Sequence, residues 1–460
     1  MVTPYEILLS ESQERMLVVA KKGHEQHVVD ILTRWDLMAA VVGEVIAEPE
    51  YRVTEGGRVV AEFPGSRLVT DCPVYYPEYR ESDEIAALRA RDVTAVEERT
   101  EEQDPVWVLE QMLSSPTIAS KRWVHRQFDT SVGTSTVAGP GGDAAVVRLR
   151  GTNKALAMCT DGNGRYVYLE PRVGGRIAVA EAARNVACTG ARPMAITNCL
   201  NFGNPKKPEV FWQFREAVAG MGEACTALGT PVTGGNVSLY NESPTSSVYP
   251  TPVVGMIGLV EQLEHITPMG FQREGDTIVL FGENTAELGG SEYLQRIHGV
   301  VAGAPPACDL EVERALIEAL LEGIRSGVVV SAHDCADGGL AVAIAECAIG
   351  DRNATRGCRV VLNAWNSLPE RARLYGEAQG RAVLTTRDPA ALLAVAERHG
   401  VPARVIGQVG GERSDVTLEL THRTIRAPAD SLAHAYHDAI PALMSRAAAA
   451  VDVTDTLIEH

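Results

Sequence analysis

The sequence predicts an α/β protein of mixed α+β character, built from two to three domains. With 460 residues, the chain exceeds the size at which one hydrophobic core is usual. Short apolar runs typical of strands alternate with segments whose apolar residues recur at helical spacing. Glycine-rich polar segments follow several predicted strands, where open α/β sheets bind ligands. These observations indicate sheet-based domains with loops suited to a small ligand.

The first hundred residues are interpreted as the end of an α/β domain whose front half is missing. We expect a helix from Gly23 to Trp35 and strands at 16–20, 39–45 and 58–61. A polar acidic stretch at 95–105 ends in proline and predicts a linker, with a solvated helix end as an equal alternative. We therefore expect three domains, at 1–104 with the linker, 105–270 and 271–460.

The middle of the chain predicts strands on both sides of its polar motifs, and two helices. One helix is expected from Pro105 to Leu113. An amphipathic helix is expected to begin at Pro208, a residue suited to a first helical position, and to end before Gly229. Its apolar residues are expected in the core: Phe211, Phe214, Val218, Met221 and Cys225. The expected strands cover 143–148, 155–159, 230–238 and 253–260.

The last third of the chain predicts a further α/β unit. Its first strand, at 276–282, leads into a glycine-bearing loop at 287–293. A helix is expected at 310–324, and a strand at 328–332 delivers the polar segment 333–339 to its carboxyl end, directly before another helix. More strands are expected at 381–385, 405–407 and 416–420.

Composition excludes several classes of protein. The net charge of −18 and the isoelectric point near 5.1 argue against a nucleic-acid groove, which needs clustered Lys and Arg. Nine cysteines without C-x-x-C spacing favour reduced thiols over zinc or disulfides, and a catalytic thiol at Cys199 is the minority alternative. No segment has the roughly 18 apolar residues of a membrane span, so we expect a cytoplasmic protein.

Oxygen-bearing side chains gather in three polar segments, 161–166, 181–185 and 197–205. The candidate ligands of a hard cation are Asp161, Glu181, Asn185, Asn198 and Asn204. Glu181 and Asn185 are four residues apart, so on a helix both project from one face. Asp143 and Asp334 are candidates to complete the shell together with phosphate oxygens. The alternative for Glu181 is a salt bridge with Arg184 or Arg192.

Two short motifs are candidates for ligand contacts. The segment from Gly234 to Ser238 offers consecutive backbone N–H groups for an anion, with Asn236 as a metal or amide partner and Ser238 as a hydroxyl donor. Taken alone, it is equally typical of a turn. Residues 11–13 supply a carboxylate, a hydroxyl and an amide, and strand alternation would place Glu11 and Gln13 on the same side; a polar turn is the alternative.

The pair His333–Asp334 invites interpretation as a catalytic dyad. Adjacent side chains on a strand point to opposite faces, so the two cannot pair simply. A metal-binding or structural role for Asp334 is therefore expected. The other histidines show no spacing that predicts a metal site.

Taken together, these motifs resemble phosphoribosylformylglycinamidine synthase, the synthetase of the fourth step of purine biosynthesis. The resemblance covers nearly the whole chain and rests on the segments 9–16, 161–168, 197–205, 234–242 and 332–339. It implies a fold like that of aminoimidazole ribonucleotide synthetase (PurM-like), in which a sheet-rich nucleotide-binding domain precedes an α/β domain. The chain would be the carboxyl-terminal part of the family's protein, preceded by the remnant of a further α/β domain and lacking the first nucleotide domain.

The resemblance also implies roles for residues. Formylglycinamide ribonucleotide would contact Glu11, Ser12, Gln13 and Ser238. ATP would contact Asn198 and Gly235, and Mg²⁺ would bind Asn236; many relatives carry aspartate in place of Asn198. A second nucleotide and magnesium site, found in large-type relatives, would use Asp143, Glu181, Asn185 and Asp334, next to Ala336 in place of a serine. No catalytic residue is assigned, because the family's catalytic histidine lies in the first nucleotide domain.

The reaction implied is a ligase reaction that forms a C–N bond. ATP would phosphorylate the amide oxygen of the substrate, and ammonia would displace phosphate to give the amidine. The partners implied are a glutaminase subunit, a small bridging subunit and the missing amino-terminal half or a second copy of the chain, without nucleic acid or membrane. We expect no activity from the chain alone. The alternative is a non-catalytic scaffold that binds ADP and Mg²⁺; selenophosphate synthetase and a hydrogenase maturation factor are disfavoured by Asn201-Phe-Gly-Asn204.

Overall fold

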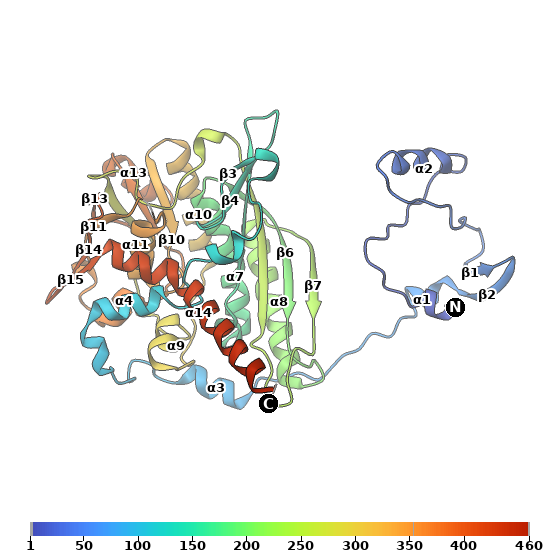
Figure 1. Ribbon diagram of the computed structural model, residues 1–460, viewed down its shortest axis with the longest axis horizontal. Coiled ribbons are helices and arrows are strands. Elements are labelled where there is room, and N and C mark those ends of the chain that lie inside the picture. Colours follow the sequence, from blue (N-terminus) through green and yellow to red (C-terminus); the bar gives the residue numbers. More distant parts are fainter. Residues whose placement is uncertain (1–2, 353, 459–460) are drawn as a thin grey trace. The chain divides into compact units, whose positions relative to one another are not determined.

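The computed structural model describes residues 3–352 and 354–458 of the chain. Contacts between Cα atoms divide the chain into two units, Met1–Tyr76 and Pro77–His460. Each unit is described by itself below (Figure 1). None of the helices in the described ranges is both long and apolar enough to cross a membrane.

The first unit holds two short helices and one hairpin. These are α1 (Pro4–Leu8), α2 (Glu25–Thr33) and the antiparallel strands β1 (Glu50–Glu55) and β2 (Arg58–Pro64). The predicted helix and the predicted strand at 58–61 are confirmed. The strands expected at 16–20 and 39–45 are wrong, because both segments are largely exposed coil and no described strand of the unit pairs with them. None of residues 3–76 is buried.

The second unit contains a six-stranded sheet with strand order β3-β4-β5-β8-β6-β7. Its strands are β3 (Thr136–Ala138), β4 (Ala145–Arg148), β5 (Ala155–Asp161), β6 (Arg192–Asn201), β7 (Val232–Ser238) and β8 (Thr251–Val260). Within the described residues, β6–β7 is the only parallel pair of this sheet. The strands expected at 143–148, 155–159, 230–238 and 253–260 are thus confirmed.

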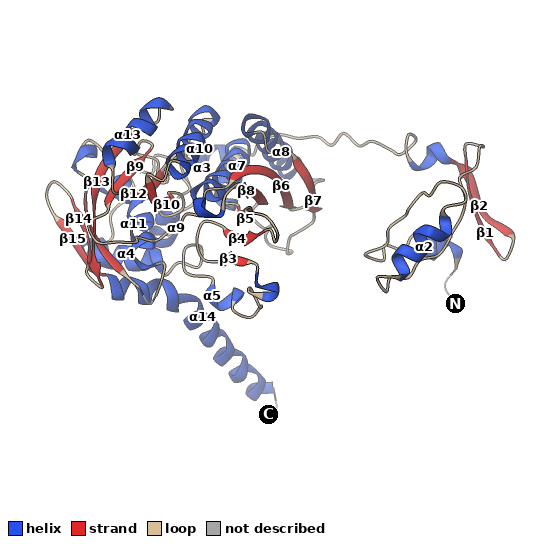
Figure 2. Cartoon of the chain, turned by 90° about the horizontal axis from the view of Figure 1, so that it is seen from above, coloured by secondary structure: helices blue, strands red, loops and turns tan. Residues whose placement is uncertain are grey.

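Two long helices cover one face of this sheet (Figure 2). They are α7 (Pro171–Cys188), which follows the short α6 (Gly164–Leu169), and α8 (Pro208–Leu228). As predicted, α8 begins at a proline, and it ends at Gly229, whose φ of 68° is left-handed and suits glycine. The helices approach closely, since a Cβ on Gly220 would lie 1.9 Å from the carbonyl oxygen of Arg172. Side chains on the opposite face, such as Met158 and Met194, are largely exposed.

A seven-stranded sheet follows, with strand order β10-β12-β9-β13-β11-β14-β15. Its strands are β9 (Thr277–Phe281), β10 (Val329–Asp334), β11 (Arg356–Val361), β12 (Ala382–Thr386), β13 (Ala403–Glu412), β14 (Asp415–Glu419) and β15 (Thr424–Pro428). The helices of this region are α9 (Glu292–His298), α10 (Leu310–Arg325), α11 (Gly339–Ile349), α12 (Glu370–Tyr375), α13 (Pro389–Arg398) and α14 (Ala429–Ile458). The predicted elements of the last third are confirmed.

The two sheets of the second unit share a hydrophobic core. Buried side chains from the six-stranded sheet, such as Val146 and Val254, lie in one cluster with Phe281 of β9, Leu320 of α10 and Leu384 of β12. The other face of β9 and β12 packs into a second cluster with α4 (Pro105–Leu113), α9 and α11. The central strands of the seven-stranded sheet are therefore covered on both faces.

The segment expected as a linker lies within the second unit. After α3 (Asp83–Ala90), the chain reaches a single 3₁₀ turn at Thr100–Gln103, directly before α4. Arg99 donates a hydrogen bond to the carbonyl oxygen of Ile297 at 2.8 Å, and Arg371 donates to that of Val96 at 2.7 Å. The boundary between the units falls earlier, at residues 76 and 77. After α4 comes the single-turn helix α5 (Arg122–His125).

Candidate functional site

A stripe of polar side chains runs along the parallel edge pair β6 and β7. The register places Cys199 opposite Asn236 and Asn201 opposite Ser238. Because side chains alternate along a strand, these four residues share the face of the sheet that α7 and α8 leave open. The side-chain nitrogen of Asn236 lies 3.9 Å from the sulfur of Cys199, which is exposed. The structure thus brings Asn236 and Ser238 together on one open polar face.

Asn198 and Gly235 face the other side of the same strands. They are direct partners in the register, and a Cβ on Gly235 would lie 2.1 Å from Oδ1 of Asn198. Gly235 is therefore a position where a side chain would displace the amide of Asn198. The pair expected to contact ATP is brought together, on the face opposite Asn236 and Ser238.

Loops follow the carboxyl ends of β6 and β7: Asn204 lies in the first of them, and Ser238, the last residue of β7, directly precedes the second. Parallel neighbouring strands end at the same edge of a sheet, so the two loops are adjacent. Phe202 donates its backbone N–H to the carbonyl oxygen of Ser238 at 3.0 Å, and Tyr240 donates to that of Gly203 at 2.9 Å. Hydrogen bonds therefore join the two loops next to the polar stripe.

A second group of candidate residues surrounds the buried guanidinium of Arg184 on α7. Arg184 donates to Asp334 with Nε and Oδ1 2.6 Å apart, and to Glu313 with Nη1 and Oε1 2.8 Å apart. All three side chains are almost completely buried. Asp334 is thereby neutralised by an ion pair, consistent with the structural role expected for it. The side chain of Glu181 makes no hydrogen bond or ion pair in the described ranges, and Arg192 pairs with Glu318 instead.

Asp143 is likewise engaged within the protein. Its Oδ1 lies 3.0 Å from Nδ1 of His333 and accepts the backbone N–H of Asp334 at 2.8 Å. The other ring nitrogen of His333 lies 3.2 Å from Glu346. Burial lowers the pKa of His333, but Asp143, Cys347 and Glu346 together outweigh this and raise that pKa well above its ordinary value. His333 and Asp334 do not pair with each other, as predicted from strand alternation.

Glu181 and Asn185 project from one face of α7 toward Asp161 at the end of β5. Asn185 donates to Asp161 with Nδ2 and Oδ2 3.1 Å apart. Burial raises the pKa of Asp161 to about 6. Burial, together with Asp337, Asp161 and Asp334, raises the pKa of Glu181 well above its ordinary range. This region therefore holds more buried carboxylates than buried cations can neutralise.

Sequence reasoning missed two acidic residues next to this region. Asp337 accepts a hydrogen bond from Asn163 at 2.9 Å, and burial raises its pKa. Glu377 accepts the N–H groups of Glu292 and Gly338, which begin α9 and α11, and the hydroxyl of Tyr166. Burial raises the pKa of Glu377 to about 8. The glycine pair after Asp337 was the available signal, but nothing in the sequence singles out Glu377.

The side chains present fit a magnesium ion only in part. In the described parts of the chain, no three His, Cys, Asp or Glu side chains are arranged to hold a metal. Of the expected second set, Asp143 and Asp334 are held in ion pairs, whereas Glu181 and Asn185 lie beside Asp161. Asn236 is uncharged, so a cation there would need phosphate oxygens as further ligands.

The remaining expected residues lie in the first unit. Glu11, Ser12 and Gln13 follow α1 in an exposed turn, where Ser10 and Ser12 share a hydrogen bond at 3.0 Å. Arg15 donates to the carbonyl oxygen of Ser12 at 3.2 Å. The segment is coil and turn, so strand alternation does not place Glu11 and Gln13 on one side. The expected substrate contacts thus belong to both units.

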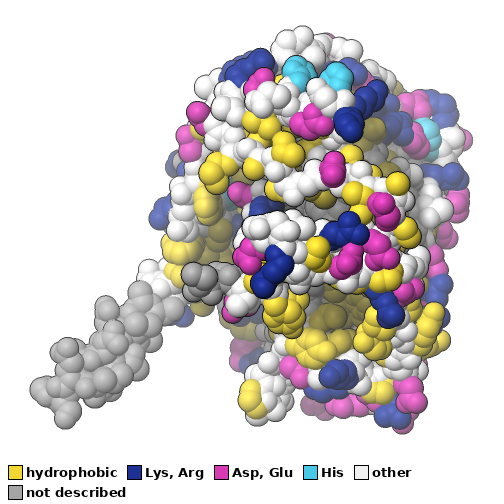
Figure 3. Space-filling view, turned by 90° about the vertical axis from the view of Figure 1, so that its right-hand side faces the viewer, with side chains coloured by type: hydrophobic (Ala, Val, Ile, Leu, Met, Phe, Trp, Pro, Cys, Tyr) yellow, Lys and Arg dark blue, Asp and Glu magenta, His cyan; other side chains and the backbone are white. Residues whose placement is uncertain are grey.

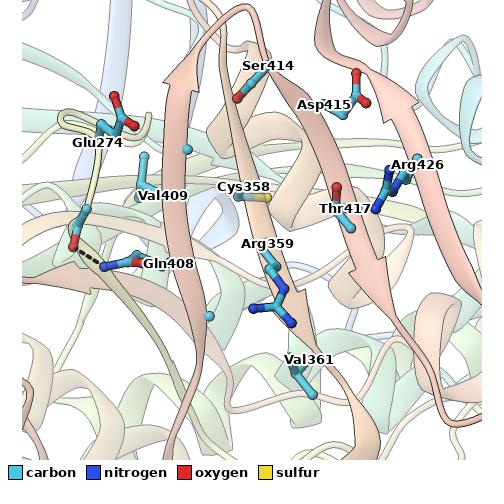
Figure 4. Close-up of a pocket in the computed structure, with 13 residues that line it drawn as sticks. Glu274, Cys358, Arg359, Val361, Gln408, Val409, Ser414, Asp415, Thr417 and Arg426 are labelled. Atoms are coloured by element: carbon cyan, nitrogen blue, oxygen red, sulfur yellow. Dashed lines mark hydrogen bonds between the residues drawn. The ribbon is translucent and has the colours of Figure 1, made fainter.

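A hollow of about 640 Å³ lies elsewhere, on the outer face of β11, β13, β14 and β15 (Figure 4). Arg359, Thr417 and Arg426 point into it, and Gln408 donates to the carbonyl oxygen of Gly275 at 2.9 Å. None of the candidate residues lines this hollow. The polar stripe and the buried carboxylates hold more of the side chains that can bind a ligand or exchange a proton. We therefore assign the candidate site to them.

Comparison with known proteins gives two family matches within the chain. The N-terminal domain of AIR synthase related protein matches residues 141–260, and the C-terminal domain of AIR synthase related protein matches residues 1–56 and 273–419. The phosphoribosylformylglycinamidine synthase subunit PurL of Moorella thermoacetica is 49% identical over 448 residues. That match covers 97% of this chain and 60% of the relative, so the chain spans about 60% of the length of the relative.

Solved structures of Thermotoga maritima PurL share the fold. The structure complexed with FGAR has a TM-score of 0.61 at 21% identity and covers 73% of this chain and 54% of that one. The structure of PurLQS has a TM-score of 0.57 at 26% identity and covers 89% and 57%. The structure complexed with ADP has a TM-score of 0.56 at 26% identity and covers 89% and 57%.

The fold and the family matches define an AIR synthase related protein, with mixed α/β domains of the PurM-like type. Within that class, the chain is similar to the phosphoribosylformylglycinamidine synthase subunit PurL, with 49% identity over the part of that protein that it spans.

Proposed function

We propose that the chain acts in the ATP-dependent conversion of formylglycinamide ribonucleotide to formylglycinamidine ribonucleotide, as a ligase that forms a C–N bond. The observation that carries the proposal is the 49% identity to the PurL subunit across 97% of the chain. A relative in this fold was solved with FGAR, and another structure of it with ADP. The open polar stripe of β6 and β7 is the part of this chain suited to such ligands.

The proposed contacts follow the family pattern on this chain's residues. Glu11, Ser12, Gln13 and Ser238 would bind the ribonucleotide, whereas Asn198 and Gly235 would bind ATP. Asn236 would hold Mg²⁺ together with phosphate oxygens, and the ion would neutralise phosphate charge. The chain's own contribution is to position the amide and the phosphates, because catalysis of phosphoryl transfer rests on positioning and charge stabilisation.

The proposal includes partners and a cellular place. Ammonia would come from a glutaminase subunit, with a small bridging subunit, in the cytoplasm. The relative solved as PurLQS supports an assembly of this kind. The open face of the six-stranded sheet and the first unit, whose residues 3–76 are all at least partly exposed, support the proposal that the chain acts together with an amino-terminal half or a second copy.

Turnover tests the proposed function. ADP release is measured with formylglycinamide ribonucleotide, ATP, Mg²⁺ and ammonium, first with the chain alone and then after addition of a separately made amino-terminal half. We expect activity only in the mixture. Normal turnover by the chain alone would contradict the need for a partner. No activity in either, with nucleotide still bound to the chain, would favour the alternative of a scaffold that binds ADP and Mg²⁺.

Two substitutions sharpen this test. Asn236→Ala and Gln13→Ala are expected to lower the activity of the mixture by at least tenfold if these side chains hold ligands. Asn153→Ala and Gln26→Ala are the matched controls, because both remove exposed amides that are not among the proposed contacts. Equal effects of the substitutions and their controls would exclude the assigned roles and leave the scaffold.

A further inference from the structure

The side-chain amide of Asn241 has a single orientation, which determines that of the Ser238 hydroxyl. Nδ2 of Asn241 lies 3.1 Å from the carbonyl oxygen of Phe202 and 2.8 Å from that of Ser238. Carbonyl oxygens only accept hydrogen bonds, so the NH₂ group must face them and Oδ1 must face away. Oδ1 lies 3.1 Å from Oγ of Ser238, and therefore the hydroxyl donates to it. The single proton of Ser238 is committed within the protein.

The backbone between the two residues is held in a conformation that suits this contact. Tyr240 has a φ of 61°, in the left-handed region that a tyrosine rarely adopts. Its N–H donates to Gly203 at 2.9 Å, and the N–H of Asn241 donates to Phe202 at 3.1 Å. Strained residues of this kind persist when the surrounding structure requires them. The turn therefore folds the amide of Asn241 back onto Ser238.

Glu242 fixes the same turn from its other side. One oxygen, Oε2, accepts from the N–H of Asn204 at 3.2 Å, from Nζ of Lys207 at 2.9 Å and from Oγ of Ser247 at 3.1 Å. These donors come from the loop after β6 and from the later part of the loop after β7. Asn241 and Glu242 together join the loops that follow β6 and β7, next to Ser238.

We infer that Asn241 is a positioning residue that makes the Ser238 hydroxyl a hydrogen-bond acceptor for the ligand. With its proton directed at Oδ1 of Asn241, the hydroxyl presents lone pairs to the open face. It is therefore matched to an N–H or O–H donor, such as an amide or a sugar hydroxyl, and not to a phosphate oxygen. This inference rests on the proposed function, in which Ser238 contacts formylglycinamide ribonucleotide.

A double-mutant cycle tests the inference. Calorimetry measures the dissociation constant of formylglycinamide ribonucleotide for the full chain mixed with the amino-terminal half, as wild type, Ser238→Ala, Asn241→Ala and the double variant. Loss of one oriented hydrogen bond is expected to weaken binding roughly three- to tenfold in each single variant. In the Ser238→Ala background, Asn241→Ala is expected to cause no further loss, because its effect passes through the hydroxyl. Thr245→Ala, which removes an exposed hydroxyl of the same loop whose hydrogen-bond partner is Ser243, is the control and should keep the wild-type constant.

Two results would overturn the inference. The first is an equal loss on Asn241→Ala with and without the Ser238 hydroxyl, which would mean that Asn241 only supports the loop. The second is an additive effect of the substitutions at 238 and 241 on the thermal midpoint of the chain without ligand. Additive shifts would show that the two side chains do not interact, whereas the inference requires the shifts to be coupled. If the wild type does not bind the ribonucleotide, the proposed function is wrong. The thermal midpoints then test by themselves the hydrogen bond between Ser238 and Asn241.

Discussion

The guanidinium of Arg184 on α7 is paired with the carboxylate of Asp334 at the end of β10, with Nε and Oδ1 2.6 Å apart. Arg184 lies in the segment that matches the N-terminal family domain, and Asp334 lies in the segment that matches the C-terminal one. Both side chains are almost completely inaccessible to solvent. The pair therefore ties the two matched domains together at a position shielded from solvent.

Arg184→Met is expected to lower the free energy of unfolding by about 3–5 kcal/mol, because Asp334 and Glu313 would be left buried without a cation. Denaturant unfolding at pH 7 measures the change. Arg192→Met is the control, since its ion pair with Glu318 is about 40% exposed and should contribute less than about 1 kcal/mol. Similar losses in both variants would show that the buried ion pair contributes no more to stability than the exposed one.

The contact between α7 and α8 predicts opposite effects for two glycines two residues apart. Gly220→Ala is expected to destabilise the chain by about 1–3 kcal/mol, because its Cβ would lie 1.9 Å from the backbone oxygen of Arg172. Gly222→Ala meets nothing within 4 Å and is expected to stabilise by about 0.5–1 kcal/mol through helix propensity. Thermal unfolding compares the two. Stabilisation by Gly220→Ala would mean that the helices are farther apart.

Stability is expected to depend on pH through Asp161. Its pKa is raised to about 6 in the folded chain by burial, so the folded state binds more protons than the unfolded state between about pH 4 and 6. Its stabilising contribution is therefore present below pH 4 and is lost as the pH rises through about 6. The size of the loss is on the order of 2 kcal/mol. Asp161→Asn removes this group and should flatten the dependence.

Denaturant unfolding at several pH values from 4 to 8 measures this dependence. Asp415→Asn is the control, because this aspartate of β14 is exposed. The expected sign would be refuted if, across this pH range, the free energy of unfolding of the wild type rose as much as that of Asp161→Asn.

The chain is expected to self-associate when isolated. Hydrophobic side chains lie on its surface, as Figure 3 shows for one face. The exposed ones include Met16, Val42 and Trp35 of the first unit and Val232 of the edge strand β7. Sedimentation velocity over a range of concentrations measures the state of association. Val232→Lys should reduce association if β7 takes part, whereas Val312→Lys, on the similarly exposed surface of α10, should not. A monomeric wild type would contradict this prediction.

Much of the fold could be predicted because local signals and burial agree. Pro208 and Gly229 delimit α8, and Asp104 caps the predicted helix α4 by accepting from the N–H groups of Val106 and Trp107. The apolar runs at 16–20 and 39–45 carry the same strand pattern as the buried ones. A strand also needs a hydrogen-bonded neighbour, which a local pattern cannot supply, and both runs are coil in the described first unit.

The candidate site was predictable only where neighbours in sequence are also neighbours in space. Glu181 and Asn185 share a helix face, and Asn236 and Ser238 share a strand face, so spacing alone related them. The pairing of Asp334 with Arg184 and that of Asp143 with His333 join residues about 150 and 190 positions apart. The amide of Asn241 contacts Ser238 because Tyr240, which precedes it, has a left-handed backbone conformation. No sequence pattern predicts that conformation.

The shared core of the two sheets bears on how the chain can be divided for experiments. Cuts between residues 260 and 273, where the two family matches meet, would separate Val146 and Val254 from Phe281, Leu320 and Leu384. Each fragment would then expose to water the side chains that formerly packed against the other. The region from Pro77 onward should therefore melt in one cooperative transition, and recombinant fragments should be designed to keep it intact.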